Sequence, residues 1–116
     1  MEQTSTFRVS ILGYREDDTW VSIALEMDIR GYGETPEAAR QDLLEMLSAQ
    51  VSYAVQSGHP ESVWKRAANE YWRMFEDARR SEFVAQVSGM LRPLDRTAEM
   101  IPLPEIPQRQ WAGAGA

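Results

Sequence analysis

A chain of 116 residues with 43% hydrophobic side chains is long enough to bury the core of one domain. It has no cysteine and a single histidine, His59, which excludes disulfides, thiolate metal sites and histidine-rich metal sites. No window approaches the roughly 20 apolar residues that span a bilayer, and the first residues lack the basic start of a secretory leader. We therefore expect a cytoplasmic protein that has no membrane segment and needs no metal or other cofactor.

The net charge of −6 is concentrated in the N-terminal half of the chain. Residues 1–59 carry ten acidic side chains against four arginines, whereas residues 60–116 carry eight charges of each sign. An acidic half repels the phosphate backbone of a nucleic acid and suits a basic protein partner. A surface that only keeps the protein soluble explains the same charge.

The first two predicted elements are strands at residues 6–14 and 19–27, which are rich in β-branched, aromatic and aliphatic side chains. The short polar segment REDD between them predicts a turn, so the strands should pair as an antiparallel hairpin. In the second strand Val21, Ile23 and Leu25 share one face. We expect the next helix to cover that face.

Two glycines, Gly31 and Gly33, stand just before the next helix in the segment IRGYGETPEAARQDL. A dinucleotide-binding loop would need a third glycine where Pro36 stands, and a P-loop would need a Gly-Lys-Ser/Thr that is absent. The pair therefore indicates a short edge strand that turns tightly into the helix and needs a close backbone approach.

The best-defined helix is predicted at residues 35–57. Thr35 is a favourable N-cap, Pro36 suits the first helical position, and Glu37 lies in the positive first turn. Gly58 and Pro60 mark its end. Its apolar residues recur at helical spacing, so the helix is amphipathic and should lie on the sheet.

A second helix is predicted from about Pro60 to residue 80, with a wide apolar stripe rich in aromatic residues. One edge of the stripe is a candidate oligomer interface, and simple burial within the chain is the equal alternative. The candidate interface residues are Trp64, Tyr71, Trp72 and Phe75.

Residues 81–91 fit a helix or a strand, and a helical continuation is favoured. The proline-rich residues 92–116 are predicted to be a flexible tail.

The segment GETPEAARQDLLEML, preceded by two antiparallel strands and a short third one, resembles the HicB-like antitoxins over residues 6 to about 56. The resemblance implies a β-β-β-α-β unit that oligomerises and binds a small basic RNA-cleaving toxin. Two features depart from the family: LEMDIRGYG replaces its usual Pro-Asp-Leu-Pro-Gly-Cys run, and the aromatic helix matches no DNA-binding module. The resemblance therefore implies a stand-alone HicB-like domain in which binding to a protein partner is better supported than binding to DNA.

The acidic residues near the predicted strand ends are the candidate surface for a basic partner: Asp17, Asp18, Glu26, Asp28 and Glu34. An alternative is a Mg²⁺ or Mn²⁺ site of the nuclease kind, built from some of these carboxylates and Asp42. Solvated surface charge explains them more simply, and no Ser-His-Asp or Cys-His arrangement exists. We expect no enzymatic activity and no catalytic or metal-binding residues.

Together these features predict an α+β fold with a small antiparallel sheet of three or four strands, one amphipathic covering helix and a C-terminal aromatic helix. Three parts follow: a HicB-like domain at residues 1–58, a helical extension packed on it at residues 59–91, and the tail at residues 92–116. The expected function is non-enzymatic partner binding by a self-associating antitoxin. The alternatives are a structural or regulatory oligomer without a toxin and, distantly, a metal-dependent nuclease.

Overall fold

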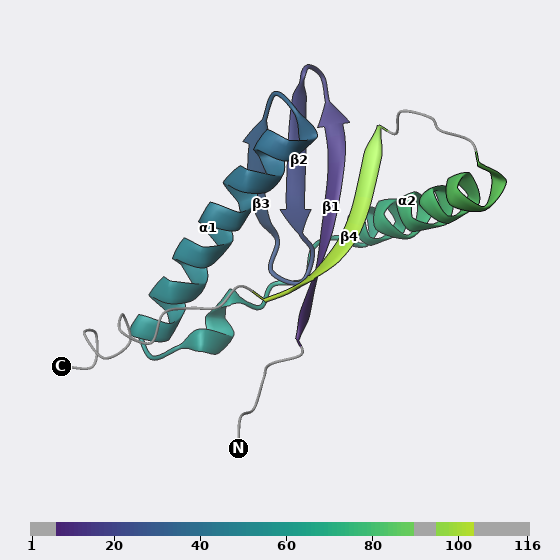
Figure 1. Cartoon of the computed structure of the whole chain (residues 1–116). Helices are drawn as coiled ribbons and strands as arrows, with labels where there is room; N and C mark the ends of the chain where they lie inside the picture. The colour runs from purple at the N-terminus through teal and green to yellow at the C-terminus, as the bar shows by residue number, and fades with distance from the viewer. Residues whose placement is uncertain (1–6, 90–94, 104–116) are drawn as a thin grey trace.

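The computed structural model describes residues 7–89 and 95–103, which form one sheet and two long helices (Figure 1). The elements in chain order are β1 (Arg8–Glu16), β2 (Thr19–Ala24), β3 (Ile29–Gly33), α1 (Pro36–Gln56), a short 3₁₀ turn η1 (Pro60–Val63), α2 (Asn69–Ser88) and β4 (Arg96–Pro102). The strands form one antiparallel sheet in the order β3-β2-β1-β4. The predicted α+β class with an antiparallel sheet of three or four strands is therefore confirmed, and the sheet has four.

The sheet is covered on both faces, and each face has its own core. Val9, Ile11 and Ala24 pack against Leu43 and Leu47 of α1. On the opposite face the buried residues of the sheet pack against α2 and the segment before it; this second core comprises Leu12, Val21, Ile23, Leu25, Ala67, Phe75, Ala78 and Ala98. The expectation that the first helix covers Val21, Ile23 and Leu25 is therefore wrong, because α1 lies on the face of the small residues Ser22 and Ala24.

The two glycines of β3 let the backbone of α1 approach the sheet closely. A Cβ atom on Gly31 would lie 2.2 Å from the backbone nitrogen of Leu43, and one on Gly33 would lie 2.5 Å from that of Ala39. Neither glycine has a positive φ angle, so the close approach is their function. At the start of α1, the Thr35 hydroxyl accepts a hydrogen bond from the Ala38 N–H, as its N-cap role predicts.

The second helix begins at Asn69, nine residues later than predicted, because the preceding segment is hydrogen-bonded to the end of β2. The N–H groups of Lys65 and Ala67 donate to the carbonyl oxygens of Glu26 and Leu25. A helical backbone at residues 64–68 could not make both bonds to the sheet. The helix then continues to Ser88, which agrees with the favoured helical assignment of residues 81–88.

The predicted flexible tail is wrong for residues 96–102, because they form the edge strand β4 against β1. Pro102 ends the strand on an edge, where a missing N–H costs no ladder bond. On one side of the sheet Arg40 of α1 holds β4 through two hydrogen bonds to Glu99, of 2.6 and 3.2 Å. Residues 104–116 lie outside the described part of the chain.

Candidate partner-binding site

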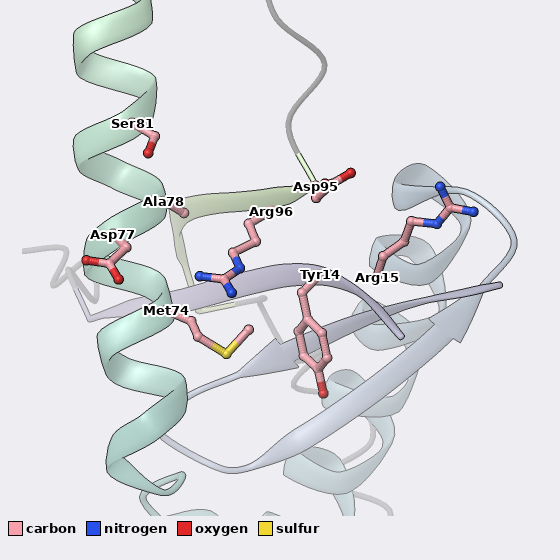
Figure 2. A pocket seen from close by; sticks show the side chains of 8 residues that line it. All are labelled: Tyr14, Arg15, Met74, Asp77, Ala78, Ser81, Asp95 and Arg96. Atoms are coloured by element: carbon pink, nitrogen blue, oxygen red, sulfur yellow. The ribbon is translucent and has the colours of Figure 1, made fainter. Parts of the chain in front are cut away.

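A cleft of about 610 Å³ lies between the middle of α2 and the adjoining ends of β1 and β4 (Figure 2). Met74, Asp77 and Ser81 line it from α2, while Tyr14 and Arg96 line it from the sheet. Figure 2 shows the Arg96 side chain extending toward the helix, whereas Arg15 and Asp95 point away from it. Asp77 lies 3.7 Å from Arg80. Ion pairing and hydrogen bonding are the chemistry that this set of groups supports.

Tyr14 at the cleft also belongs to an aromatic and cationic stack. Its ring stacks on Tyr71 at 6.1 Å, and the Arg30 guanidinium lies 4.8 Å from the centre of the Tyr71 ring. Burial, together with the nearby Tyr71 and Glu16, raises the pKa of Tyr14 to about 12. The stack ties β1 and β3 to the first turn of α2, so it holds the inner end of the helix in place.

The raised pKa of Tyr14 predicts a loss of stability at alkaline pH. Between the ordinary tyrosine pKa of 10.0 and about 12, the unfolded chain loses this proton while the folded chain keeps it, so unfolding becomes easier as the pH rises. Below that window Tyr14 is neutral in both states and adds no pH dependence. We expect Tyr14→Phe to flatten the fall in unfolding free energy above pH 10, as measured by urea denaturation. An equal fall in both proteins would show that Tyr14 is not the group responsible.

The two edges of the sheet differ in how their outer backbone groups are satisfied. On the β3 edge the Tyr32 N–H donates to the Asp42 carboxylate of α1 at 2.9 Å. Next to β4, the Leu103 N–H donates to the Phe7 carbonyl. This bond shows that Leu103 and every second residue before it direct their N–H groups toward β1. Since bonding alternates along antiparallel strands, the N–H groups of Arg96, Ala98 and Met100 point outward. Within the described residues no hydrogen bond satisfies these three groups.

The predicted acidic surface is divided between the two ends of the sheet. Asp17 and Asp18 form the exposed turn between β1 and β2, and Glu34 follows β3 at the same end. Glu26 and Asp28 lie at the opposite end, between β2 and β3. The predicted hairpin already implies this separation, because its turn holds Asp17 and Asp18 and the far end of its second strand holds Glu26 and Asp28.

Of the four carboxylates that were weighed as metal ligands, Glu26, Asp28 and Asp42 have structural partners, and Glu34 is exposed. Glu26 accepts a hydrogen bond from the Ser10 N–H at 2.8 Å, Asp28 lies 3.2 Å from Arg30, and Asp42 binds the Tyr32 N–H. Across residues 7–89 and 95–103, no group of three or more acidic or histidine side chains is arranged to hold a metal ion.

The four aromatic residues predicted at an oligomer interface are used mostly within the chain. Phe75 is buried, and Tyr71 and Trp72 pack on the same core under α2. Trp64 is 47% exposed and meets Phe7 edge to face at 4.8 Å, away from the other three. The alternative of simple burial therefore describes Tyr71, Trp72 and Phe75 as they stand in this chain.

The exposed apolar surface of α2 lies in its second half, which sequence reasoning did not single out. Phe83, Val84 and Val87 are 65%, 55% and 71% exposed. They occupy the side of α2 that faces away from the sheet. Figure 1 shows that the helix extends beyond β4. The open edge of β4 was also missed, although Thr97, Glu99 and Ile101 alternate with Ala98 and Met100 as strand residues do.

Comparison with protein-family models, curated proteins and solved structures finds no match to this chain. In the part of the chain that the structure describes, neither long helix is apolar enough to cross a membrane.

Proposed function

We propose that this chain is a non-enzymatic partner-binding module, in the form of a HicB-like antitoxin that binds a small basic toxin protein. The observation that carries the proposal is the unequal protection of the two sheet edges among the described residues: on β3 one of the two outward N–H groups, that of Tyr32, is bonded to Asp42 of α1, whereas on β4, beside the cleft, none of the three outward N–H groups is bonded. Proteins normally protect such edges, and an open one is a template for pairing with another chain. The element order supports the HicB-like resemblance in its first part, since three strands are followed by α1, but α2 stands between α1 and the strand that completes the sheet.

The basic character of the partner is supported by the charges at one end of the sheet. Asp17, Asp18 and Glu34 gather there, all exposed, and Glu16 and Glu37 flank them. Acidic side chains grouped in this way attract a positively charged protein and speed its association at low ionic strength. Glu26 and Asp28 take no part in this surface, because they lie at the other end.

The charge reversal of Asp17, Asp18 and Glu34 to lysine should release the basic partner. Pull-down from cytoplasm at low salt should recover a small protein rich in lysine and arginine with the native chain, and the triple variant should lose it. Raising the ionic strength should have the same effect, because the Debye length falls from about 10 Å at 0.1 M salt. All three residues are exposed, and Asp17 has a φ angle of +59° that lysine adopts less readily than aspartate, so the circular dichroism spectrum checks that the fold persists.

The matched control carries lysine at Glu45, Glu70 and Glu76, which are exposed acidic residues on the two helices. It changes the net charge equally and should keep the partner. Retention of the partner by the Asp17, Asp18 and Glu34 variant, or its loss from both variants, would contradict the assignment of this surface.

Self-association without a toxin is the second candidate function, and the exposed apolar residues of α2 favour it. Phe83, Val84 and Val87 form a continuous patch on two turns of the helix. Patches of this kind mark protein contacts more often than single exposed apolar residues do. This patch replaces the four aromatic residues as the candidate oligomer interface.

Val87→Glu should therefore shift the protein from a dimer or larger assembly toward monomer, because the charge would be buried unpaired at the interface. Light scattering at tens of micromolar protein measures the change, and Gln86→Glu, on an exposed neighbouring position, is the control. A native protein that is monomeric at that concentration would remove this candidate.

A further inference from the structure

The outer edge of β4 has the backbone groups that another strand would need. The N–H groups of Arg96, Ala98 and Met100 alternate with the inward ones that bond to β1. The edge runs over seven residues, or roughly 23 Å at about 3.3 Å per residue. This length can pair with an extended segment of six or seven residues.

The second half of α2 extends past this edge and would lie over an added strand. Ala78 is the last buried residue of the helix, and it packs in the same core as Ala98 of the edge strand. Ten further helical residues follow Ala78, which corresponds to about 15 Å of helix, and of these Arg79 still contacts Met100 of β4. Neighbouring strands lie only about 4.8 Å apart, so the helix would cover a fifth strand beside β4. Figure 1 shows α2 running outward past β4.

Three charged side chains lie beside the position of such a strand: Glu82, Arg96, and Arg79, whose Nη1 lies 3.7 Å from the Met100 sulfur. Glu82 lies four residues after Ala78 and seven after Phe75, so it continues the side of α2 that faces the sheet. It is partly buried, whereas its neighbours Ser81 and Phe83 are exposed. Arg96 lies on the same side of the sheet as Ala98 and extends into the cleft. Neither Glu82 nor Arg96 forms an ion pair with any residue that the structure describes.

We propose that the β4 edge binds an extended segment of the basic partner as a fifth, antiparallel strand, with a lysine or arginine opposite Ala98 and beneath Glu82. Directly opposite residues of paired strands point to the same face, so this side chain would meet the Glu82 carboxylate. The same rule places an acidic residue opposite Arg96 and an apolar one opposite Met100. The inference rests on the proposed function for the basic character of the partner. It places the partner's docking strand at the β4 edge, which is separate from the acidic surface of Asp17, Asp18 and Glu34.

Two pairings of β4 with a second copy, centred on Ala98 and on Glu99, meet obstacles that a segment of another protein does not meet. Twofold pairing centred on Ala98 would place both α2 helices over the same point, since Ala98 lies beneath Ala78. Pairing centred on Glu99 would set two like charges directly opposite each other, which is unfavourable. A segment that carries no helix on this face meets neither obstacle.

The test uses two synthetic peptides with the full-length protein. The first is Ser-Thr-Val-Thr-Lys-Thr-Asp-Thr-Ser, which presents valine, lysine and aspartate on one face of a strand, and the second has glutamate in place of lysine. Nuclear magnetic resonance follows the hydrogen exchange of individual amides during the titrations. We expect the lysine peptide to slow exchange at Ala98 and Met100, and to bind about two- to fivefold more tightly than the glutamate peptide.

Two variants connect the effect to the named groups. Glu82→Lys should invert the preference between the two peptides, whereas Glu76→Lys, on an exposed position of the same helix, should leave it unchanged. Met100→Pro should abolish the protection without unfolding the protein, because the lost N–H points away from β1 and proline is tolerated on an edge strand. Thermal unfolding checks that this variant is folded.

The proposal would be overturned if neither peptide slowed exchange at the β4 edge, or if Glu82→Lys left the preference as it was. Protection that rises with protein concentration in the absence of peptide would assign the edge to a second copy instead. The two proposals can fail separately. If the Asp17, Asp18 and Glu34 reversal releases a basic partner that leaves the β4 amides unprotected, only the proposed function is supported. If the peptide effect depends on charge but the pull-down recovers no basic protein, only this inference is supported.

Discussion

Gly31→Ala should cost about 3 kcal/mol or more of the free energy of unfolding, at or above the upper end of the usual cost of overpacking. The new Cβ would lie 2.2 Å from the Leu43 nitrogen and 2.6 Å from its Cα, so it would meet backbone atoms that no side-chain rotation can move. Relief requires α1 to move away from β3, which opens the core around Leu43 and Leu47. Urea or thermal denaturation measures the loss.

Gly89→Ala is the control for the general cost of removing a glycine. Gly89 has a φ angle of +71° at the end of α2, and a Cβ there would meet nothing within 4 Å. Its replacement should cost about 1–2 kcal/mol, from backbone strain alone. Equal losses at the two positions would show that α1 does not press on β3 as the structure indicates.

Phe75→Ala should destabilise the domain by about 3–5 kcal/mol, because it removes the largest buried side chain of α2 from the second core. Phe83→Ala on the same helix is the matched control, since Phe83 is 65% exposed and Phe75 is 2% exposed. The control should change the free energy of unfolding by less than about 0.5 kcal/mol.

The contrast between these two phenylalanines tests whether α2 covers the second face of the sheet. A large loss from Phe83→Ala and a small one from Phe75→Ala would mean that the helix is rotated from its position in the structure. It would also remove Glu82 from the side that faces the sheet, because Glu82 and Phe75 share that side.

Local signals were sufficient to predict the hairpin and the first helix. The helix was expected at residues 35–57 and occupies Pro36–Gln56, because Thr35 and Pro36 fix its start through the chain's own hydrogen bonds and covalent geometry. The strands β1 and β2 follow from β-branched and aliphatic residues on both sides of a polar turn. These features depend only on neighbouring residues.

The features that depend on distant residues were not predictable. Residues 64–68 contain good helix formers, yet hydrogen bonds to Leu25 and Glu26 hold them extended. The prolines around strand β4 indicated a tail and outweighed its weak alternation, and its pairing with β1 shows that it is a strand. The sequence did not show that both faces of the sheet are covered. Both faces of β2 carry buried residues, and the alternation of Val21 and Ile23 does not indicate which helix covers them.

The candidate site shows the same limit. The antiparallel topology places Asp17, Asp18 and Glu34 at one end of the sheet. It places Glu26 and Asp28 at the other end. Glu82 is a candidate binding residue because it lies just beyond the sheet edge, and the sequence around it does not indicate where that edge is. The acidic composition could therefore suggest a class of partner, while the surface that would bind it depended on the fold.

Hydrogen exchange of the free protein, followed residue by residue at low concentration, tests the unequal protection of the sheet edges most directly. The amides of Ala98 and Met100 should exchange rapidly, while those of Thr97 and Glu99 in the same strand should be slowed by their bonds to β1, and Tyr32 on the opposite edge should be slowed by Asp42. Asp42→Ala should speed exchange at Tyr32 alone among these residues. Slow exchange at Ala98 and Met100 in the dilute monomer, equal to that at Thr97 and Glu99, would show that the β4 edge is already occupied and would contradict the account.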